Sequence, residues 1–292
     1  MSGGSSSVVS VPGWERFSWL RHGFSTRHGG VSTVYYPQDI DDKELSGKRY
    51  KSDLNLGRTK DDDPANVVEN RRRLVAAVTG QEQWPLVTLR QVHSAVSLVL
   101  PEPEIRPLSE SVGSEGRALL EADGLMTGKA GVLLGIQTAD CVPVFVVDTK
   151  LRVVAGFHAG WRGTGARIVE RGVAQMAAAF GSDPADMVAA VGPSIGACCY
   201  SVGDAVRESF TMEFSYGESL FARKSGSGDT LYLDLWEANR RQLLDAGVTA
   251  SEISVIGQCT GCTGLPGRRK YFSHRCEHGF TGRMMNVIGV AR

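Results

Sequence analysis

Three long apolar runs follow one another in the middle of the chain. Between residues 131 and 157 they read Val-Leu-Leu-Gly-Ile, Val-Pro-Val-Phe-Val-Val and Arg-Val-Val-Ala-Gly-Phe. A strand that is covered on both faces is apolar at consecutive positions, so these runs predict buried central strands. Residues 86–100 predict one or two further strands. Segments 187–191, 253–257 and 284–290 predict one strand each.

Apolar residues at helical spacing predict four helices. The first covers residues 64–78 and carries Pro64 in its first turn. The second covers 164–180 and is closed by Gly181, the residue type that most often ends a helix. The other two are expected at 203–214 and 234–246. The Pro/Glu/Ser-rich residues 101–121 predict a surface excursion.

The mixture of strands and helices predicts one α+β (mixed α/β) domain with large sheets over residues 13–292. No composition break interrupts this stretch. Residues 1–12 are rich in Ser, Gly and Val, and we expect them to form a flexible lead-in. The chain of 292 residues is 42% apolar and 22% charged, which supplies ample material for a packed core.

Charge and composition narrow the class of protein. The chain has 32 lysines and arginines and 32 aspartates and glutamates, so its formal net charge is zero. A protein without net positive charge does not attract a nucleic acid over its whole surface. Gln137 and Asp140 interrupt the most apolar window, which argues against a membrane span. Six cysteines, with no export signal over residues 1–12, favour free thiols, and we expect a cytoplasmic location.

Three residues that bind borderline metals lie near the ends of predicted strands, namely His93, Cys141 and His158. Zinc accepts imidazole and thiolate ligands, and Cu²⁺ is the alternative ion. Three protein ligands would leave a fourth position open, as catalytic zinc sites do. The spacing alone leaves the alternative open, which is a core cysteine with two hydrogen-bonded histidines.

The remaining cysteines allow a second site. Cys259-x-x-Cys262 is followed by His274, Cys276 and His278, which are suitable ligand types without a second paired-cysteine signature. A zinc site and a set of reduced side chains both stay open for these five residues. We interpret the vicinal pair at 198–199 as packing.

A series of motifs occurs in a fixed order along most of the chain. They are His-Gly-Phe-Ser-Thr-Arg-His-Gly-Gly-Val-Ser (22–32), Asp-Leu-Asn-Leu-Gly (53–57), Glu-Asn-Arg (69–71), Gln-Val-His (91–93), Ala-Asp-Gly-Leu-Met-Thr (122–127), Thr-Ala-Asp-Cys-Val-Pro-Val (138–144), His-Ala-Gly-Trp-Arg-Gly-Thr (158–164), Gly-Pro-Ser-Ile-Gly-Ala-Cys-Cys-Tyr (192–200) and Cys-Thr-Gly-Cys (259–262). This order resembles the multicopper polyphenol oxidoreductase, or laccase-domain, family of the purine nucleoside phosphorylase type.

The resemblance implies a four-layer α-β-β-α sandwich and a metal site at His93, Cys141 and His158. It also implies phosphorolysis of adenosine, inosine and S-methyl-5'-thioadenosine, together with adenosine deamination. The partners would then be small nucleosides and phosphate, and the protein a monomer or a small homo-oligomer. The residues around 274–278 depart from the family's usual arginine and aspartate.

Copper-dependent polyphenol oxidation, which the family name suggests, is the first alternative function. A blue-copper centre with a trinuclear cluster needs many more histidines than the six in this chain, and no His-x-His pair occurs. One mononuclear copper site could still form from two histidines and a cysteine. Such a site moves single electrons, so we expect phenol oxidation at most as a side activity.

The phosphate site is predicted at the motif 160–165, which runs into the helix expected at 164–180. Backbone N–H groups, Arg162 and Thr164 could hold an anion there. The alternative is a tight turn with a solvated arginine. Arg27, next to two glycines, and Asn55, in the 53–57 motif, are further candidates for substrate or phosphate.

Deamination requires an acidified water and a carboxylate that moves a proton. Asp140 adjoins Cys141 and is the first candidate, and Asp123 is the second. Both could instead cap turns. Gln91 lies two residues before His93, on the same face of a predicted strand, and could contact substrate or orient a ligand.

Two other mechanisms stay open. Cys141 and His158 could act as nucleophile and base of a hydrolase, a pair found in deamidating toxins of the fold that the resemblance implies. Editing of a peptidoglycan precursor is the other alternative. The sequence does not rank adenosine, inosine and S-methyl-5'-thioadenosine as substrates.

Overall fold

Two large sheets form the frame of the computed structural model, which describes residues 7–36, 52–100, 120–225, 228–265 and 268–292. The first sheet has the order β1-β2-β16-β6-β3 and contains β1 (Val8–Val9), β2 (Leu20–Ser25), β3 (Leu86–Thr88), β6 (Val132–Thr138) and β16 (Met284–Val290). The second sheet has the order β13-β9-β7-β8-β5-β4 and contains β4 (Ser97–Val99), β5 (Gly124–Thr127), β7 (Val142–Asp148), β8 (Val153–Ala159), β9 (Met187–Val191) and β13 (Ile253–Val255).

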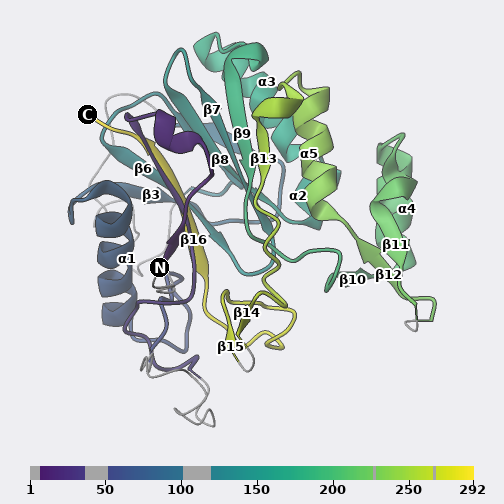
Figure 1. Cartoon of the computed structure of the whole chain (residues 1–292), viewed down its shortest axis with the longest axis horizontal. Coiled ribbons are helices and arrows are strands. Elements are labelled where there is room, and N and C mark those ends of the chain that lie inside the picture. Colours follow the sequence, from purple (N-terminus) through teal and green to yellow (C-terminus); the bar gives the residue numbers. More distant parts are fainter. Residues whose placement is uncertain (1–6, 37–51, 101–119, 226–227, 266–267) are drawn as a thin grey trace.

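Helices cover the outer faces of both sheets. Helix α1 (Pro64–Thr79) lies on the first sheet, and α2 (Trp161–Gly165), α3 (Ile168–Phe180) and α5 (Leu235–Asp245) lie on the second (Figure 1). Four layers therefore follow one another as helix, sheet, sheet, helices, which confirms the expected α+β sandwich. Helix α4 (Asp204–Glu213) stands beside a small sheet of β10 (Ser201–Val202), β12 (Leu231–Leu233) and β11 (Phe221–Arg223).

The smaller elements complete the description. Strands β14 (Gly264–Leu265) and β15 (Arg268–Arg269) pair with each other. Short 3-10 helices cover Trp14–Arg16, Pro184–Asp186, Gly217–Leu220 and Ala250–Glu252. Residues 101–119 of the predicted surface excursion lie outside the described residues, as do residues 1–6 of the predicted lead-in.

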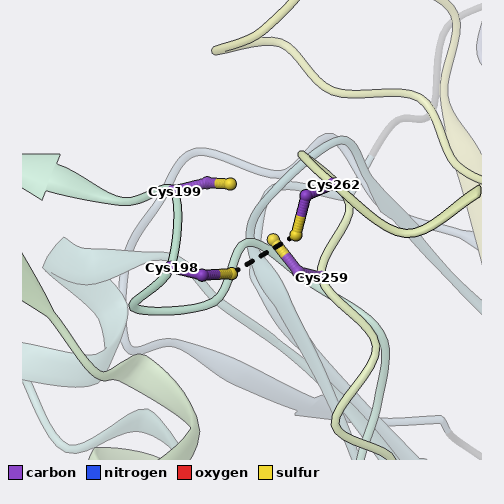
Figure 2. Close-up of side chains that lie close together, drawn as sticks. All are labelled: Cys198, Cys199, Cys259 and Cys262. Carbon is purple, nitrogen blue, oxygen red and sulfur yellow. Dashed lines mark hydrogen bonds between the residues drawn. The ribbon is translucent and has the colours of Figure 1, made fainter. Parts of the chain in front are cut away.

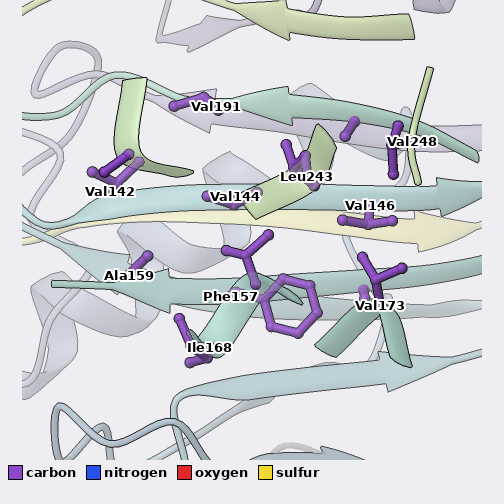
Figure 3. Packing of buried hydrophobic residues seen from close by; sticks show 14 of the residues in the cluster. Val142, Val144, Val146, Phe157, Ala159, Ile168, Val173, Val191, Leu243 and Val248 are labelled. Carbon is purple, nitrogen blue, oxygen red and sulfur yellow. The ribbon is translucent and has the colours of Figure 1, made fainter. Parts of the chain in front are cut away.

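The strand period explains why the central runs are apolar at every position. In β7, Val144 and Val146 face the helices, where Phe157 of β8 and Val173 of α3 pack against them (Figure 3). The intervening Phe145 faces the first sheet, and its ring stacks on Phe24 of β2 with 4.6 Å between centroids. Both faces of β7 are thus inside the molecule.

Two helix predictions had different outcomes. Helix α1 begins at Pro64 as predicted, and the side chain of Asp63 accepts a hydrogen bond from the Ala65 amide. The single helix predicted over 164–180 is wrong at its start, because α2 ends at Gly165 and Arg167 takes a left-handed conformation with φ 60° before α3 begins. Gly181 ends α3 as predicted, with φ 73°.

The first sheet begins earlier in the chain than expected. Val8 and Val9 pair with β2, and Val11 is buried. The predicted flexible lead-in is therefore wrong for residues 8–11. Strand β2 was not predicted because Arg21, His22 and Gly23 interrupt its apolar pattern.

Candidate metal centre and its cavity

The structure brings His93, Cys141 and His158 together. Their ligand atoms lie within 4.8 Å of one another. His93 lies on the connection from β3 to β4, and Cys141 lies on the connection from β6 to β7. Both connections cross from the first sheet to the second, whereas His158 belongs to β8 of the second sheet. The three residues are thus gathered at one rim of the sandwich.

Strand register and one glycine set the local geometry. Pro143 of β7 lies opposite His158 of β8, so Cys141, just before β7, lies beside this histidine. A Cβ atom on Gly160 would approach Cys141 Sγ to 3.0 Å and His93 Cδ2 to 3.2 Å. A residue larger than glycine at position 160 would therefore press on two of the three ligands.

Asp123 accepts hydrogen bonds from two of the candidate ligands. Its buried Oδ1 accepts hydrogen bonds from the His93 amide at 3.0 Å and from His158 Nδ1 at 2.8 Å. Its Oδ2 accepts from the Ser94 amide at 2.6 Å and from the Val92 amide at 3.2 Å. Because Nδ1 of His158 is engaged, Nε2 is left to bind an ion. Asp123 is fully buried and does not line the cavity described below, so it is placed to position the ligands rather than to exchange protons with a substrate.

The electrostatics favour the thiolate form of Cys141. Burial alone would raise the pKa of this thiol, but the charge of His158 and hydrogen bonds from His158 and His93 lower it to about 6. Burial lowers the pKa of His158, whereas Cys141 and Asp123 raise it more strongly, to about 9. Thiolate is the form of cysteine that binds metal.

A cavity of about 710 Å³ opens beside the three residues. Its wall combines basic, aromatic and apolar side chains with one carboxylate. The lining residues are Arg58, Arg71, Thr88, Leu89, Arg90, Gln91, His93, Gln137, Thr138, Ala139, Asp140, Cys141, His158, Trp161, Ile195, Tyr200, Leu235, His274, Arg275 and Arg283. A wall of this composition suits an anionic ligand that carries an apolar ring.

Four arginines in this wall have no carboxylate partner among the described residues, namely Arg58, Arg71, Arg275 and Arg283. The guanidinium of Arg275 donates to Ser201 and lies over the Tyr200 ring, which leaves Arg58, Arg71 and Arg283 as the candidates for an anion. Arg71 is buried and donates from Nε to the Leu56 carbonyl at 3.0 Å. Burial and, next, the charge of Arg58 lower the pKa of Arg71 to about 10, so it stays cationic at neutral pH. Arginine clusters without counter-charges are ready binding sites for phosphate.

Asp140 and Gln91, both predicted from the sequence, line the cavity. Asp140 Oδ1 accepts from Thr260 Oγ1 at 2.6 Å, and its Oδ2 accepts from the Arg275 amide at 2.7 Å. The side-chain amide of Gln91 makes two hydrogen bonds to the backbone of Gln137, at 2.7 and 2.8 Å. Gln91 lies on a connection rather than on the predicted strand, and it ties that connection to β6.

Arg27, Asn55 and Thr164 are buried and do not line the cavity, contrary to their predicted contact with substrate or phosphate. Arg27 is held between Asp53 and Glu277, with 2.8 Å ion pairs to each. Asn55 Oδ1 accepts a hydrogen bond from the Arg283 amide at 2.9 Å and so positions a cavity residue. Thr164 Oγ1 donates to the Ala159 carbonyl at 3.3 Å.

Arg162, also predicted to bind phosphate, lies outside the cavity wall. Its guanidinium stacks on the Trp161 ring at 4.4 Å, and Trp161 itself lines the cavity. Arg162 is exposed, and α2 covers only Trp161–Gly165. The anion site at this helix start is therefore not formed as predicted.

The sequence carried one unused signal for the arginine cluster. Arg71 shares helical spacing with Val67 and Leu74, which places a charged residue on the apolar face of α1. An arginine on a buried helix face requires a partner or a ligand. Arg58 and Arg283 lie on connections and gave no such signal.

Comparison with known proteins decides the family. The model of the family described as "Multi-copper polyphenol oxidoreductase laccase" matches residues 21–291. The chain belongs to this family. A curated member, purine nucleoside phosphorylase YlmD of Geobacillus stearothermophilus, is 37% identical over 288 residues, which are 95% of this chain and 94% of that protein. Adenosine deaminase RL5, from an unknown prokaryotic organism, is 36% identical over 219 residues, which are 75% and 81% of the two chains.

The solved members of the laccase-like family share the fold. The crystal structure of YlmD from Geobacillus stearothermophilus aligns with a TM-score of 0.79 and 32% identity, covering 100% of this chain and 98% of that one. YfiH of Bacillus licheniformis aligns with a TM-score of 0.78 and 30% identity, covering 97% and 96%. Within the described residues, no helix is long and apolar enough to cross a membrane.

Proposed function

We propose that this chain is a metal-dependent purine nucleoside phosphorylase that acts on adenosine, inosine and S-methyl-5'-thioadenosine and also deaminates adenosine. One observation carries the proposal. A single cavity joins the His93, Cys141 and His158 centre to Arg58, Arg71 and Arg283, none of which has a carboxylate partner among the described residues. The relatives named purine nucleoside phosphorylase and adenosine deaminase support the same chemistry.

The donor set fits zinc, with Cu²⁺ as the alternative. His158 and His93 offer imidazole nitrogens, Cys141 offers a thiolate, and Asp123 fixes both histidines. When bound there, zinc supplies a Lewis acid and lowers the pKa of water toward 7. All six cysteines are free thiols, which supports our expectation of a reducing cytoplasm.

We assign phosphate to Arg58, Arg71 and Arg283. Guanidinium groups present paired N–H donors that match phosphate oxygens, and their charge offsets that of the anion. Bound there, phosphate would be held in the same cavity as the nucleoside, which replaces a bimolecular encounter with a positioned one. This assignment takes the place of the site predicted at 160–165.

Apolar and aromatic residues of the same cavity suit the nucleoside. Leu89, Ile195 and Leu235 offer apolar contact to the purine, and Trp161 and Tyr200 offer aromatic contact. Burial and, next, the charge of Cys141 raise the pKa of Tyr200 to about 12, so its phenol stays protonated and can donate a hydrogen bond. We assign proton transfer to Asp140, the one carboxylate in the described wall.

One observation favours a second candidate, a Cys/His hydrolase. Cys141, His158 and Asp123 form a chain of thiol, imidazole and carboxylate, with 2.8 Å between His158 Nδ1 and Asp123 Oδ1. This order matches the nucleophile, base and orienting group of cysteine hydrolases. Such an enzyme would work without metal.

The test is turnover of adenosine with phosphate, with and without a chelator. We expect adenine and ribose 1-phosphate from phosphorolysis and inosine from deamination, and we expect the chelator to abolish both reactions. Full turnover in chelator, lost on alkylation of Cys141, would select the hydrolase. A muropeptide precursor and a phenol with Cu²⁺ serve as comparison substrates, and turnover of these alone would reject the proposal.

A further inference from the structure

A second cluster of metal-binding residues lies outside the mechanism proposed above. The Sγ atoms of Cys198, Cys199, Cys259 and Cys262 lie within 4.8 Å of one another, and those of Cys198 and Cys262 are 3.5 Å apart (Figure 2). Four sulfur atoms at the corners of a tetrahedron around zinc, with Zn–S bonds of roughly 2.3 Å, are about 3.8 Å apart. The spacing of the four thiols is therefore close to that of a closed zinc site.

Backbone hydrogen bonds bring the two cysteine pairs together. Cys198 and Cys199 lie in a turn in which the Tyr200 amide donates to the Gly196 carbonyl at 3.0 Å. Cys259 and Cys262 lie on the connection after β13, and Ser194 forms a parallel bridge with Cys259. Backbone contacts of the fold thus hold both loops in place next to each other.

Two amides already point at one of the sulfur atoms. Cys259 Sγ accepts hydrogen bonds from the Gly196 and Gly261 amides, each at 3.3 Å. The second bond runs within the Cys-x-x-Cys motif, from the residue two places after the first cysteine. Amide donors of this kind stabilise a metal-bound thiolate and fix its direction.

Cations lie beside both loops. Lys224 Nζ donates to the Cys198 carbonyl, and Arg269 Nε donates to the Gly261 carbonyl at 2.9 Å. Four thiolates around a divalent ion leave two negative charges, which nearby cations offset. Of the five residues for which the sequence left a second site open, only Cys259 and Cys262 belong to this cluster. Cys198 and Cys199, interpreted from the sequence as a packing pair, complete it in place of His274, Cys276 and His278.

We propose that Cys198, Cys199, Cys259 and Cys262 bind a zinc ion as a closed structural site. The ion cross-links the turn at 196–200 to the connection at 258–262. Both segments reach the cavity of the proposed enzyme. Tyr200 lines it directly, and Thr260 bonds to Asp140. The site therefore fixes one wall of the cavity without contacting substrate.

Metal content of the purified full-length chain, loaded with zinc and then desalted, tests the proposal. Wild type is expected to hold two equivalents. Cys141→Ser isolates the second site and is expected to hold one, bound by the four cysteines. The double variant Cys259→Ser and Cys262→Ser is also expected to hold one, at the first site. Cys276→Ser is the matched control, and it should retain both.

Cobalt identifies the ligands. Co²⁺ bound to Cys141→Ser should give the intense thiolate-to-metal absorption of a tetrathiolate site, and Cys262→His should keep one ion there because three cysteines and a histidine also bind zinc. Absence of zinc and Co²⁺ from Cys141→Ser, with the four cysteines of the cluster either alkylatable or paired in two disulfides in its mass spectrum, would overturn the proposal. That outcome is independent of the first site, because Cys141→Ser lacks it. If the double variant fails to fold, the Cys141→Ser measurement decides alone.

Discussion

Cys141 is held close to two imidazoles, and in the metal-free protein this should make it reactive. Its pKa of about 6 keeps most of the thiol ionised at neutral pH, and thiolate is the form that attacks iodoacetamide. Cys199 gives the contrast, because burial and, next, the charge of Cys259 raise its pKa far above the ordinary value. The two residues differ in chemistry although both are half-buried.

We predict that iodoacetamide alkylates Cys141 of the metal-free protein with a midpoint near pH 6. The rate should fall as the pH drops through that value, because protonation removes the thiolate, and it should level off above pH 7. Zinc should suppress the reaction. Peptide mass spectrometry reports the modification at each cysteine. A midpoint near the ordinary thiol value of about 8.5 would contradict the described contacts with His158 and His93.

Asp123 gives a second prediction at this scale. Asp123→Asn retains the shape of the side chain but turns one acceptor oxygen into an N–H donor facing other donors. We expect zinc affinity at the first site to fall roughly 10–100-fold, as for other carboxylates behind metal-binding histidines. The zinc concentration that half-protects Cys141 from alkylation measures this affinity.

A buried carboxylate elsewhere supplies the control. Asp148 ends β7 far along the strand from Cys141, and it accepts hydrogen bonds from the Lys150 and Leu151 amides. Asp148→Asn should lower the free energy of unfolding and leave zinc affinity unchanged. An equal loss of affinity in both variants would mean that Asp123 acts on stability rather than on the ligands.

Arg71 tests the phosphate assignment. Arg71→Gln removes one charged donor, and the loss of a charge-assisted hydrogen bond of about 1.5–3 kcal/mol corresponds to roughly 10–100-fold weaker binding. We expect KM for phosphate to rise by that factor, while adenosine deamination, which needs no phosphate, is retained. Arg72→Gln is the matched control, because Arg72 is exposed and bonds to Glu69. An unchanged KM in Arg71→Gln would remove Arg71 from the phosphate site.

Among the elements, α3 shows how closely the outer layer approaches the sheet. A Cβ atom on Gly172 would lie 2.3 Å from the ring of Phe157 in β8. In an open helix, a glycine-to-alanine change stabilises by about 1 kcal/mol. Here the aromatic ring occupies the space, and the sign of the effect should reverse.

We therefore predict that Gly172→Ala lowers the free energy of unfolding by about 1–3 kcal/mol, the usual cost of overpacking a core. Urea unfolding measures the change. Ala174→Gly, at an exposed position of the same helix, should cost only about 1 kcal/mol through helix propensity. A stabilised Gly172→Ala would show that the helix can move away from Phe157.

Elements with strong periodicity could be predicted from the sequence, and those with local exceptions could not. The runs in β6, β7 and β8 are apolar on both faces, and α1 carries its own start signal at Asp63 and Pro64. The break between α2 and α3 depends on the left-handed Arg167, which tertiary contacts to Glu213 and Phe214 hold in place. The pattern of apolar and polar residues in the sequence does not reveal such contacts.

The same distinction applies to the site. His93, Cys141 and His158 were found because their chemistry is rare and the surrounding motifs resemble a family. The arginines to which we assign phosphate were missed because arginines are common and usually solvated, and only the fold brings Arg58 and Arg283 to the same cavity as Arg71. The predicted set of Arg27, Asn55 and Thr164 consists instead of polar residues that the fold uses internally.

At the scale of the whole molecule, the two sheets share one apolar interior. Side chains from β2, β16, β7 and β8 meet there, and Phe24 stacks on Phe145 across it. A chain of this length often unfolds through intermediates. If one sheet unfolded alone, the inner face of the other would lose its apolar contacts and become exposed to water. We therefore expect both sheets to unfold together.

The prediction is that urea unfolding of the metal-free protein gives coincident transitions by tryptophan fluorescence and far-ultraviolet circular dichroism. Trp84 reports on the α1 side and Trp236 on the α5 side, so variants retaining one or the other can follow each layer. Coincidence of the curves is the standard sign of one cooperative unit. Two separated midpoints would show that the sheets are independent.

The arginines and the candidate ligands reach the cavity from different parts of the chain. Arg71 belongs to α1, Arg58 lies before α1 and Arg283 lies before β16, whereas Cys141 and His158 adjoin β7 and β8 of the second sheet. Exchange of the short segments around residues 58 and 283 could therefore change which oxyanion the enzyme accepts, for example to arsenate or a phosphate ester. The part of the site around Cys141 and His158, where the base departs, would keep its residues.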